Sequence, residues 1–409
     1  MRSCSASWRC RSASSASQWR MSAGRSSSTW CSPAGCGRTG TSTAARPPSS
    51  PAGPGSRANP SPQLPRTRRN EMRRLLTLCC LILALPPAPA AAAATCLRGV
   101  NISGAEFGTV PGRYGFDYLY PPASTIGRFA GLGLTTMRLP IRWERLQPAL
   151  RQPLDPEELA RLEATVSAAT QAGMRTVIDL HNYAYYGKAR IGTEMVTAEA
   201  FADVWRRLAQ HFRGDASVVF GLMNEPHDIP ADRWLIAANA AIAAIREVGA
   251  RQLVLVPGSG WTGAHSWTAD LPTGNNAAVM LGTVDPGNNV AYEVHQYLDA
   301  DYSGTHAECS RGADALQAVE RLTGWLAQNG RRAFLGEIGA PGNRGCPERL
   351  AAVLRHVNAN PQQWVGWTAW AAGDLWAPDY PLRLDPAGAT APVVAAIQAA
   401  ARAKPSCEP

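Results

Sequence analysis

The sequence predicts an α/β fold, namely a single (β/α)8 barrel. About eight short apolar runs alternate with stretches of helical spacing over roughly 310 residues, starting at Leu97. Polar, aromatic and ionisable residues directly follow several of these runs. A parallel barrel gathers the carboxyl ends of its strands on one face, so these residues are expected to meet there.

The predicted strands are short, rich in aliphatic residues, and separated by enough chain for a helix. In order they are Leu97–Ile102, Thr135–Leu139, Thr176–Leu180, Val218–Met223, Gln252–Val256, Ala291–Val294, Ala333–Gly336 and Val365–Trp370. An open doubly wound sheet is the alternative, and it would favour a Gly-x-Gly-x-x-Gly turn after the first strand. Gly99 and Gly104 do not form that turn, which favours the closed barrel.

The predicted helices have apolar faces at helical spacing and recognisable ends. Asp155 is expected to cap the first of them, with Pro156 at its first position and Gly173 at its end. The others are predicted at Ala198–Phe212, Ala231–Val248, Asp314–Gln328, Arg349–Asn358 and Val393–Ala401. We expect one folded domain over residues 95–409.

The N-terminal segment differs in composition from the rest of the chain. Residues 1–71 carry eleven Arg against a single acid, Glu71, a balance of 11 − 1 = +10 within a formal net charge of +9. Their Ser, Arg, Pro and Gly content cannot form a core, so we interpret them as disordered or as a mis-called upstream segment. The remainder is close to neutral, which argues against a nucleic-acid partner.

Residues 72–94 have the pattern of a secretory signal peptide. Met72-Arg73-Arg74 precedes a short apolar stretch, and Ala92-Ala93-Ala94 offers a cleavage site before Thr95. The apolar stretch is too short to span a bilayer. We therefore expect a secreted or periplasmic protein without a membrane anchor in its mature form.

The cysteines support export. Cys96, Cys309, Cys346 and Cys407 remain after signal removal, an even number that favours disulfides in an oxidising compartment. Three pairings are possible, and we favour Cys96–Cys407 with Cys309–Cys346. No close Cys-x-x-Cys pair occurs among the four, so a zinc site is not expected.

Two glutamates follow two of the predicted strands. Glu225 comes after the fourth strand, within Asn224-Glu225-Pro226, and Glu337 comes after the seventh. Two carboxyl groups aimed into one pocket from separate strands are the minimum equipment for cleaving a glycosidic bond. Other strand-end residues that would share this face are Arg138, His181, Tyr183, His295, Tyr297 and Trp370.

These strand-end runs resemble a known family. Met137–Pro140, Ile178–Ala184, Gly221–Asp228 and His295–Cys309 are similar to family 5 glycoside hydrolases, in particular the branch of secreted endo-β-1,4-glucanases. The resemblance covers about residues 97–400. It implies a retaining, two-carboxylate double-displacement mechanism without metal or cofactor, with Glu225 as acid/base and Glu337 as nucleophile.

Physical chemistry gives this division of roles a rationale. Glu225 would need a raised pKa to be protonated near neutral pH, and Glu337 would need donors, for which Arg138 and Tyr297 are candidates. Asn224 is expected at the sugar 2-hydroxyl, His295 beside Glu225, His181 on the sugar, and Trp370 under the ring. Further aromatic candidates for substrate contact are Trp143, Tyr183, Tyr186, Trp261 and Trp376.

Three other functions compete with that of a β-glucan hydrolase. A metal-dependent barrel hydrolase would need a ligand cluster such as His-x-His, which none of the seven His forms. A non-catalytic polysaccharide-binding barrel would not need both carboxylates. A β-1,4-mannanase or a xyloglucan-active hydrolase of the same family remains open, because a few loop side chains select the sugar. We expect a monomer.

Overall fold

The computed structural model describes residues 96–404. Residues 1–71, the signal peptide at 72–94, and Cys407 lie outside the described residues. The interpretations given for these segments, and the Cys96–Cys407 pairing, therefore stay predictions.

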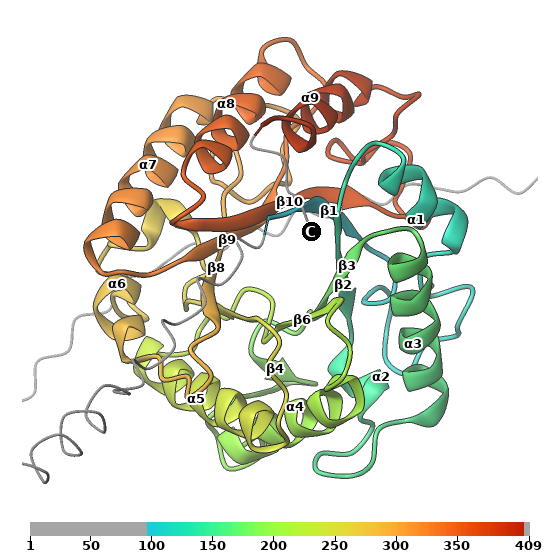
Figure 1. The fold of residues 1–409 in the computed structure, drawn as a ribbon, viewed down its shortest axis with the longest axis vertical. Coiled ribbons are helices and arrows are strands. Elements are labelled where there is room, and N and C mark those ends of the chain that lie inside the picture. Colours follow the sequence, from blue (N-terminus) through green and yellow to red (C-terminus); the bar gives the residue numbers. More distant parts are fainter. Residues whose placement is uncertain (1–95, 405–409) are drawn as a thin grey trace, which may run out of the picture. The chain divides into compact units, whose positions relative to one another are not determined.

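Eight parallel strands close into a barrel, in the order β1-β10-β9-β8-β7-β6-β3-β2 (Figure 1). Each predicted strand is present, with its ends shifted by a few residues. The strands are β1 Leu97–Ile102, β2 Thr136–Ile141, β3 Arg175–Leu180, β6 Val218–Gly221, β7 Val254–Pro257, β8 Val290–His295, β9 Ala333–Ile338 and β10 Trp364–Ala372. The predicted (β/α)8 barrel is thus confirmed.

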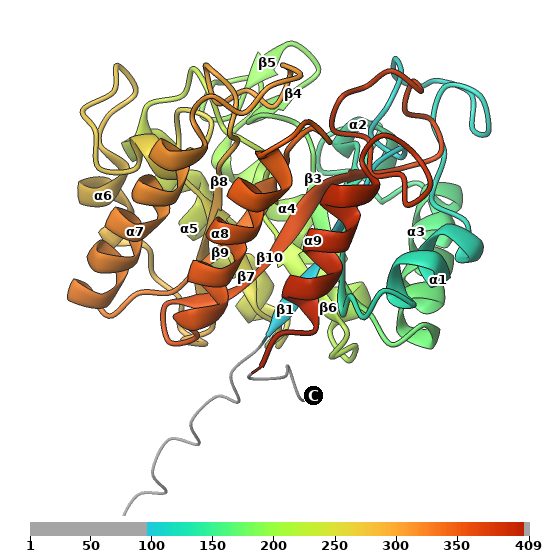
Figure 2. The same cartoon turned by 90° about the horizontal axis from the view of Figure 1, so that it is seen from above.

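Helices surround the barrel, and a short β4–β5 hairpin lies at the end where the strands finish (Figure 2). The helices are α1 Ala123–Ala130, α2 Trp143–Leu146, α3 Pro156–Gln171, α4 Ala198–Phe212, α5 Ala231–Glu247, α6 Asn276–Val279, α7 Gly312–Gln328, α8 Cys346–Ala359 and α9 Ala391–Ala401. The hairpin pairs Tyr185–Tyr186 with Ala189–Arg190. Asp155 caps α3 as predicted, because its side chain accepts from the backbone of Glu157 and Glu158 at 3.0 and 2.9 Å.

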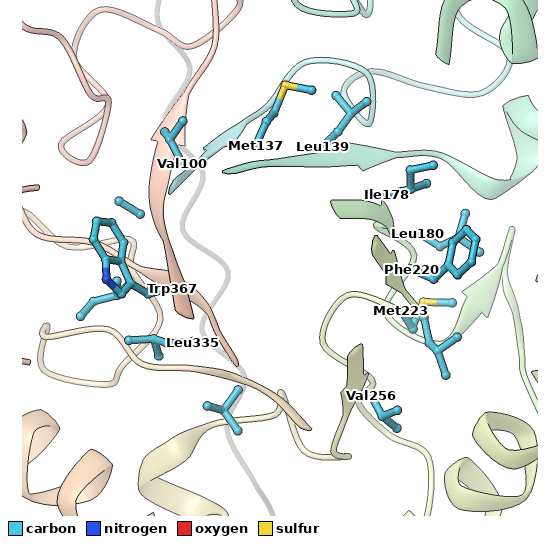
Figure 3. Close-up of a cluster of buried hydrophobic side chains, with 14 of the residues drawn as sticks. Val100, Met137, Leu139, Ile178, Leu180, Phe220, Met223, Val256, Leu335 and Trp367 are labelled. Atoms are coloured by element: carbon cyan, nitrogen blue, oxygen red, sulfur yellow. The ribbon is translucent and has the colours of Figure 1, made fainter. Parts of the chain in front are cut away.

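Alternation along each strand divides the core into two parts. Side chains such as Val100, Ile178 and Phe220 point from the strands toward the helices (Figure 3). The intervening positions form a second buried cluster: Leu97, Val177, Val219, Leu253, Leu255, Ala291, Phe334 and Val365. This cluster fills the barrel interior, as expected for a closed barrel of this size.

A disulfide ties the loop after β8 to the start of α8. Cys309 and Cys346 form the predicted bond, with their Cα atoms 5.7 Å apart. The loop it anchors, residues 299–309, carries side chains that reach the mouth of the barrel, so the bond helps to fix one wall of the site described next.

Candidate active site

Buried polar residues occupy the upper inward-facing positions of the barrel, above the apolar interior. They are Asn101 on β1, Arg138 on β2, Asp179 on β3 and Glu293 on β8, and each is fully buried. Like the interior apolar residues, they point into the barrel. Side chains alternate along a strand, and Ile178 and Leu180 on either side of Asp179 pack outward. Charged groups this deep need partners.

Arg138 supplies those partners. Its Nε lies 2.8 Å from Glu293, and its Nη2 lies 3.1 Å from Asp179. Its remaining N–H groups donate to Asn101 Oδ1 at 2.9 Å, Asn224 Oδ1 at 2.8 Å and Glu337 Oε1 at 2.9 Å. All five N–H groups of the guanidinium thereby have a partner, so one buried cation organises carboxylates and amides from five other strands or their ends.

Glu337 is held at the top of this layer by two donors. A register irregularity between β8 and β9 sets His295 opposite Glu337, and such irregularities are frequent next to active sites. Arg138 donates to Oε1, and the Tyr297 hydroxyl donates to Oε2 at 2.5 Å. Burial raises the pKa of the Glu337 carboxyl, while the positive charges of His295 and Arg138 oppose that rise. Guanidinium donates and cannot accept, so this pairing favours the carboxylate form.

Glu225 lies beyond the end of β6 in a different setting. Its backbone has a φ of +39°, a conformation that non-glycine residues rarely adopt and that recurs at functional sites. Its side chain is 17% exposed against 4% for Glu337. One carboxylate oxygen of each residue lies within 4.8 Å of the other. The two carboxyl groups therefore face one another across a small space, and Glu225 is more exposed to solvent than Glu337.

His295 connects the two carboxyl groups. Its Nδ1 lies 2.7 Å from Glu225 Oε1 and 3.5 Å from Glu337 Oε2. Burial alone would lower the pKa of His295, but the Glu337 charge and hydrogen bonds to Glu225 and Glu293 raise it to about 10. The imidazole is therefore cationic at neutral pH, and its Nδ1–H donates to Glu225.

On one side of the carboxyl pair, His181 and Trp370 form a flat wall. Their rings stack with centroids 5.7 Å apart and an interplanar angle of 14°. Burial lowers the pKa of His181 to about 3, so the ring is neutral and its Nδ1–H donates to Asp179 at 2.8 Å. The Tyr183 hydroxyl lies 3.3 Å from the other ring nitrogen. Trp370 also donates to the hydroxyl of Tyr380, a contact that the sequence reasoning missed.

On the other side, a cavity of about 550 Å³ opens next to Glu225. Trp261, 51% exposed, stacks on His227 with ring centroids 3.9 Å apart. His265 stacks on Tyr302 at 4.2 Å along another part of the lining. Trp261 was predicted to reach substrate, whereas the two histidines and Tyr302 were not. The only sequence signal for His227, His265 and Tyr302 was their position in the loops after β6, β7 and β8.

One of the proposed aromatic contacts belongs elsewhere. Trp143 is fully buried and packs edge-on against Tyr186 and Phe201, so its assignment as a substrate-contacting residue is wrong. Tyr186 is partly buried and its hydroxyl donates to the backbone of Gln147, and its contact with substrate stays a prediction. Trp376 is half-buried and stacks on Tyr380, next to the Trp370 wall.

Two groups of described residues bring three ligand-type atoms within 4.8 Å of one another: Glu225, His295 and Glu337, and Asp299, Asp301 and His306. In the first, a cationic His295 has no free lone pair for a metal. In the second, the buried Asp299 already accepts from the backbone of Gly304, Thr305 and His306. The expectation that no metal takes part stays a prediction.

Comparison with known proteins assigns the chain to a family. The family model described as cellulase, glycosyl hydrolase family 5, matches residues 94–373. The chain belongs to glycosyl hydrolase family 5. The endo-beta-1,4-glucanase B of Aspergillus niger is 37% identical to this family 5 enzyme over 295 residues, 72% of the chain and 86% of the relative.

Solved structures of the same family match this glycoside hydrolase over three quarters of its length. A triple-substituted endo-beta-1,4-glucanase from Xanthomonas axonopodis pv. citri is 45% identical with a TM-score of 0.72, covering 75% of this chain and 99% of that one. XacCel5A in complex with cellopentaose is 44% identical with a TM-score of 0.73 and the same coverage. Cel5A from Hypocrea jecorina is 31% identical with a TM-score of 0.64, covering 71% and 92%.

Proposed function

We propose that this family 5 glycoside hydrolase is a retaining endo-β-1,4-glucanase that cleaves internal bonds of cellulose or related β-glucans. The observation that carries the proposal is the pairing of Glu225 with Glu337. A carboxylate oxygen of one lies within 4.8 Å of a carboxylate oxygen of the other. Retaining enzymes hold their carboxyl groups roughly 5–5.5 Å apart, whereas inverting enzymes leave roughly 6.5–9.5 Å for a water molecule.

In the first step, Glu337 attacks the anomeric carbon while Glu225 protonates the leaving oxygen. The C1–O bond to the leaving sugar breaks, and a covalent glycosyl ester forms on Glu337. The two donors on Glu337, Arg138 and Tyr297, hold it ionised and in one orientation before the attack. The amide nitrogen of Asn224 has no partner among the described residues and is available to a sugar hydroxyl.

In the second step, Glu225 takes a proton from water, which attacks C1 and releases Glu337. His295 Nδ1 lies 2.7 Å from Glu225 Oε1 and donates to it. This short hydrogen bond holds the Glu225 carboxyl group in one orientation. His295 would therefore act as a positioning residue for Glu225.

The aromatic surfaces on both sides of the carboxyl pair support a polymeric substrate. Trp370 offers a flat face on the Tyr380 side, and Trp261 offers another at the cavity next to Glu225. Pyranose rings present apolar faces that stack on such side chains. Relatives named endo-beta-1,4-glucanase and a structure titled as a cellopentaose complex agree with a glucan chain as substrate.

We further propose export and a monomeric state. Among residues 96–404, no helix combines the length and the apolar character needed to cross a bilayer. Cleavage before Thr95 would place the mature N-terminus next to Cys96. N-terminal peptide analysis of protein recovered from culture medium tests the cleavage site, and light scattering tests the monomer.

The substrate assignment is tested by reducing-end release from carboxymethylcellulose, glucomannan, xyloglucan and xylan. We expect the highest kcat/KM on carboxymethylcellulose, with a rapid fall in viscosity that marks internal cleavage. A higher kcat/KM on glucomannan or xyloglucan would instead assign the alternative specificity within the family. Glu337→Gln should abolish turnover while oligosaccharide binding remains, and activity retained in this variant would refute the role of Glu337 as nucleophile.

A further inference from the structure

Arginines gather at the end of the barrel opposite the active site. Arg175 is the first residue of β3, Arg213 follows the last residue of α4, and Arg251 precedes β7. All three line one hollow of about 300 Å³, whose floor is formed by Val218, Val219 and Leu253. The hollow adjoins the first residues of β3 and β6, and Figure 2 shows the starts of the strands at the end of the barrel away from the β4–β5 hairpin.

The three guanidinium groups have no counter-charge. None of them forms a hydrogen bond or an ion pair with another residue in the described range 96–404. The lining of the hollow contains no carboxylate. The nearby acids are engaged elsewhere, since Asp285 pairs with Arg246 and Asp215 accepts from Ser217. Three positive charges around one hollow without a carboxylate make it attractive to an anion.

The wall of the hollow is held in place by local hydrogen bonds. The Gln252 amide donates to the backbone carbonyls of Phe212 and Asp215 at 2.6 and 3.1 Å. These bonds connect the segment that carries Arg251 to the segment that carries Arg213. The two arginines therefore extend from a fixed frame, which lowers the cost of ordering them around a ligand.

A second hollow, of about 520 Å³, lies along the start of β8 and is also lined by arginines. It is lined by Arg331 and Arg332 together with amide side chains, again without a carboxylate. Arg332 reaches Asn289, which lines the first hollow, at 3.4 Å. Residues 96–404 hold 27 basic and 29 acidic residues, a formal balance of 27 − 29 = −2, so this basic end contrasts with the domain as a whole.

We propose that the hollow lined by Arg175, Arg213 and Arg251 is a binding site for an oxyanion of the phosphate class, free or repeated along a chain. Guanidinium groups bind such anions through paired, charge-assisted hydrogen bonds. A single phosphate occupies the first hollow. A chain of phosphates extends from it into the Arg331–Arg332 hollow and gains affinity from both.

The site is tested by calorimetric titration of the full-length protein with orthophosphate and with tripolyphosphate, at constant ionic strength set with sodium chloride. Constant ionic strength removes simple screening as a cause. We expect saturable binding. Replacing two exposed arginines, Arg213→Gln with Arg251→Gln, weakens it by about tenfold or more. The matched pair Arg321→Gln with Arg355→Gln, exposed on α7 and α8, leaves the dissociation constant within about twofold.

The two sources of the anion give different results. Tripolyphosphate that binds at least about tenfold more tightly than orthophosphate, with the advantage lost in Arg331→Gln, supports a chain-borne anion. Equal affinity supports a single free ion. Either result agrees with the site, provided that Arg213→Gln with Arg251→Gln weakens binding.

Two results overturn the proposal. One is the absence of saturable binding of either anion at constant ionic strength. The other is an equal loss of affinity in the α7–α8 control pair, which would mark a general charge effect. Hydrolysis of β-glucan by each variant serves as the folding control, because none of the replaced arginines lines the active-site cavity. Since binding is measured without turnover, the result does not depend on the proposed catalytic function.

Discussion

Arg138 Nη1 and Glu337 Oε1 lie 2.9 Å apart in a site where both side chains are almost completely buried. The same guanidinium contacts Asp179, Glu293, Asn101 and Asn224. A single cation thus compensates for the burial of Glu337, the proposed nucleophile, and of the two carboxyl groups beneath it. We therefore expect Arg138 to matter for stability as well as for activity.

Replacing Arg138 by Met should destabilise the fold strongly. The change leaves buried carboxyl groups without their partner, and breaking a buried ion pair in this way costs about 3–5 kcal/mol. Urea unfolding measures the loss. Arg207→Met, which removes a partly exposed ion pair on α4, should cost about 1 kcal/mol or less. Equal losses in the two variants would show that the buried network is not special.

Replacing Glu225 by Ala should separate the two chemical steps. Polymer hydrolysis should fall by about 10³-fold or more, because the glucan leaving group needs a proton. An aryl cellobioside with a leaving group of low pKa needs no proton, so its glycosylation step should be much less impaired. Stopped-flow release of the phenolate measures that step. Equal losses on both substrates would contradict the acid/base role of Glu225.

Replacing Tyr297 by Phe should shift the acid limb of the pH–rate profile. The hydroxyl donates to Glu337 Oε2, so its loss removes stabilisation of the carboxylate and raises the pKa of Glu337. The nucleophile must be ionised, and activity should therefore be lost at a higher pH on acidification than in the wild type. Tyr292→Phe, at a buried tyrosine outside the site, should leave the limb in place. An unchanged limb in Tyr297→Phe would argue against this hydrogen bond in solution.

His295 should make stability fall at alkaline pH. Its pKa in the folded state is about 10, above the ordinary value of 6.5. Its contribution is therefore complete below about pH 6.5 and is lost as pH rises toward 10. Urea unfolding at a series of pH values should give a shallower decline over this window in His295→Gln than in the wild type. Parallel declines would mean that His295 is neutral in the folded protein.

Replacing Glu106 should stabilise the protein at alkaline pH. Burial raises the pKa of this carboxyl to about 7, and its Oε1 has no partner among the described residues. The raised pKa costs stability above the unfolded-state value, up to about 3 kcal/mol when Glu106 is fully ionised. Glu106→Gln should therefore be more stable than the wild type at pH 8 and not at pH 4. A uniform change at both values would assign the effect to packing instead.

The sequence predicted the scaffold and the top of the site better than the layer beneath it. Strand periodicity located the barrel, and strand ends located Glu225 and Glu337. Asn101 and Glu293 went unnoticed because each lies inside an apolar run, where a polar residue has no motif of its own. The available signal was that both residues, like Arg138, occupy positions that face the barrel interior, since inward and outward positions alternate along each strand.

Other features depend on tertiary contacts that no local pattern contains. Trp143 follows a strand, like Glu225 and His181, yet α2 turns it into the core against Phe201. The stacked pairs of His227 with Trp261 and His265 with Tyr302 arise from separate loops. Cys309 and Cys346 could be paired because both follow adjacent strands, β8 and β9, of a closed barrel.

The most direct test of the proposed chemistry is mass spectrometry after inactivation with a 2-deoxy-2-fluorocellobiosyl fluoride. A retaining enzyme forms a slowly hydrolysed ester with this reagent on its nucleophile. Trypsin releases Glu337 in the peptide 333–344, in which it is the only acidic residue. We expect one added fluorocellobiosyl group on this peptide. A label on the peptide that contains Glu225, or a label elsewhere, would contradict the assignment of Glu337 as nucleophile.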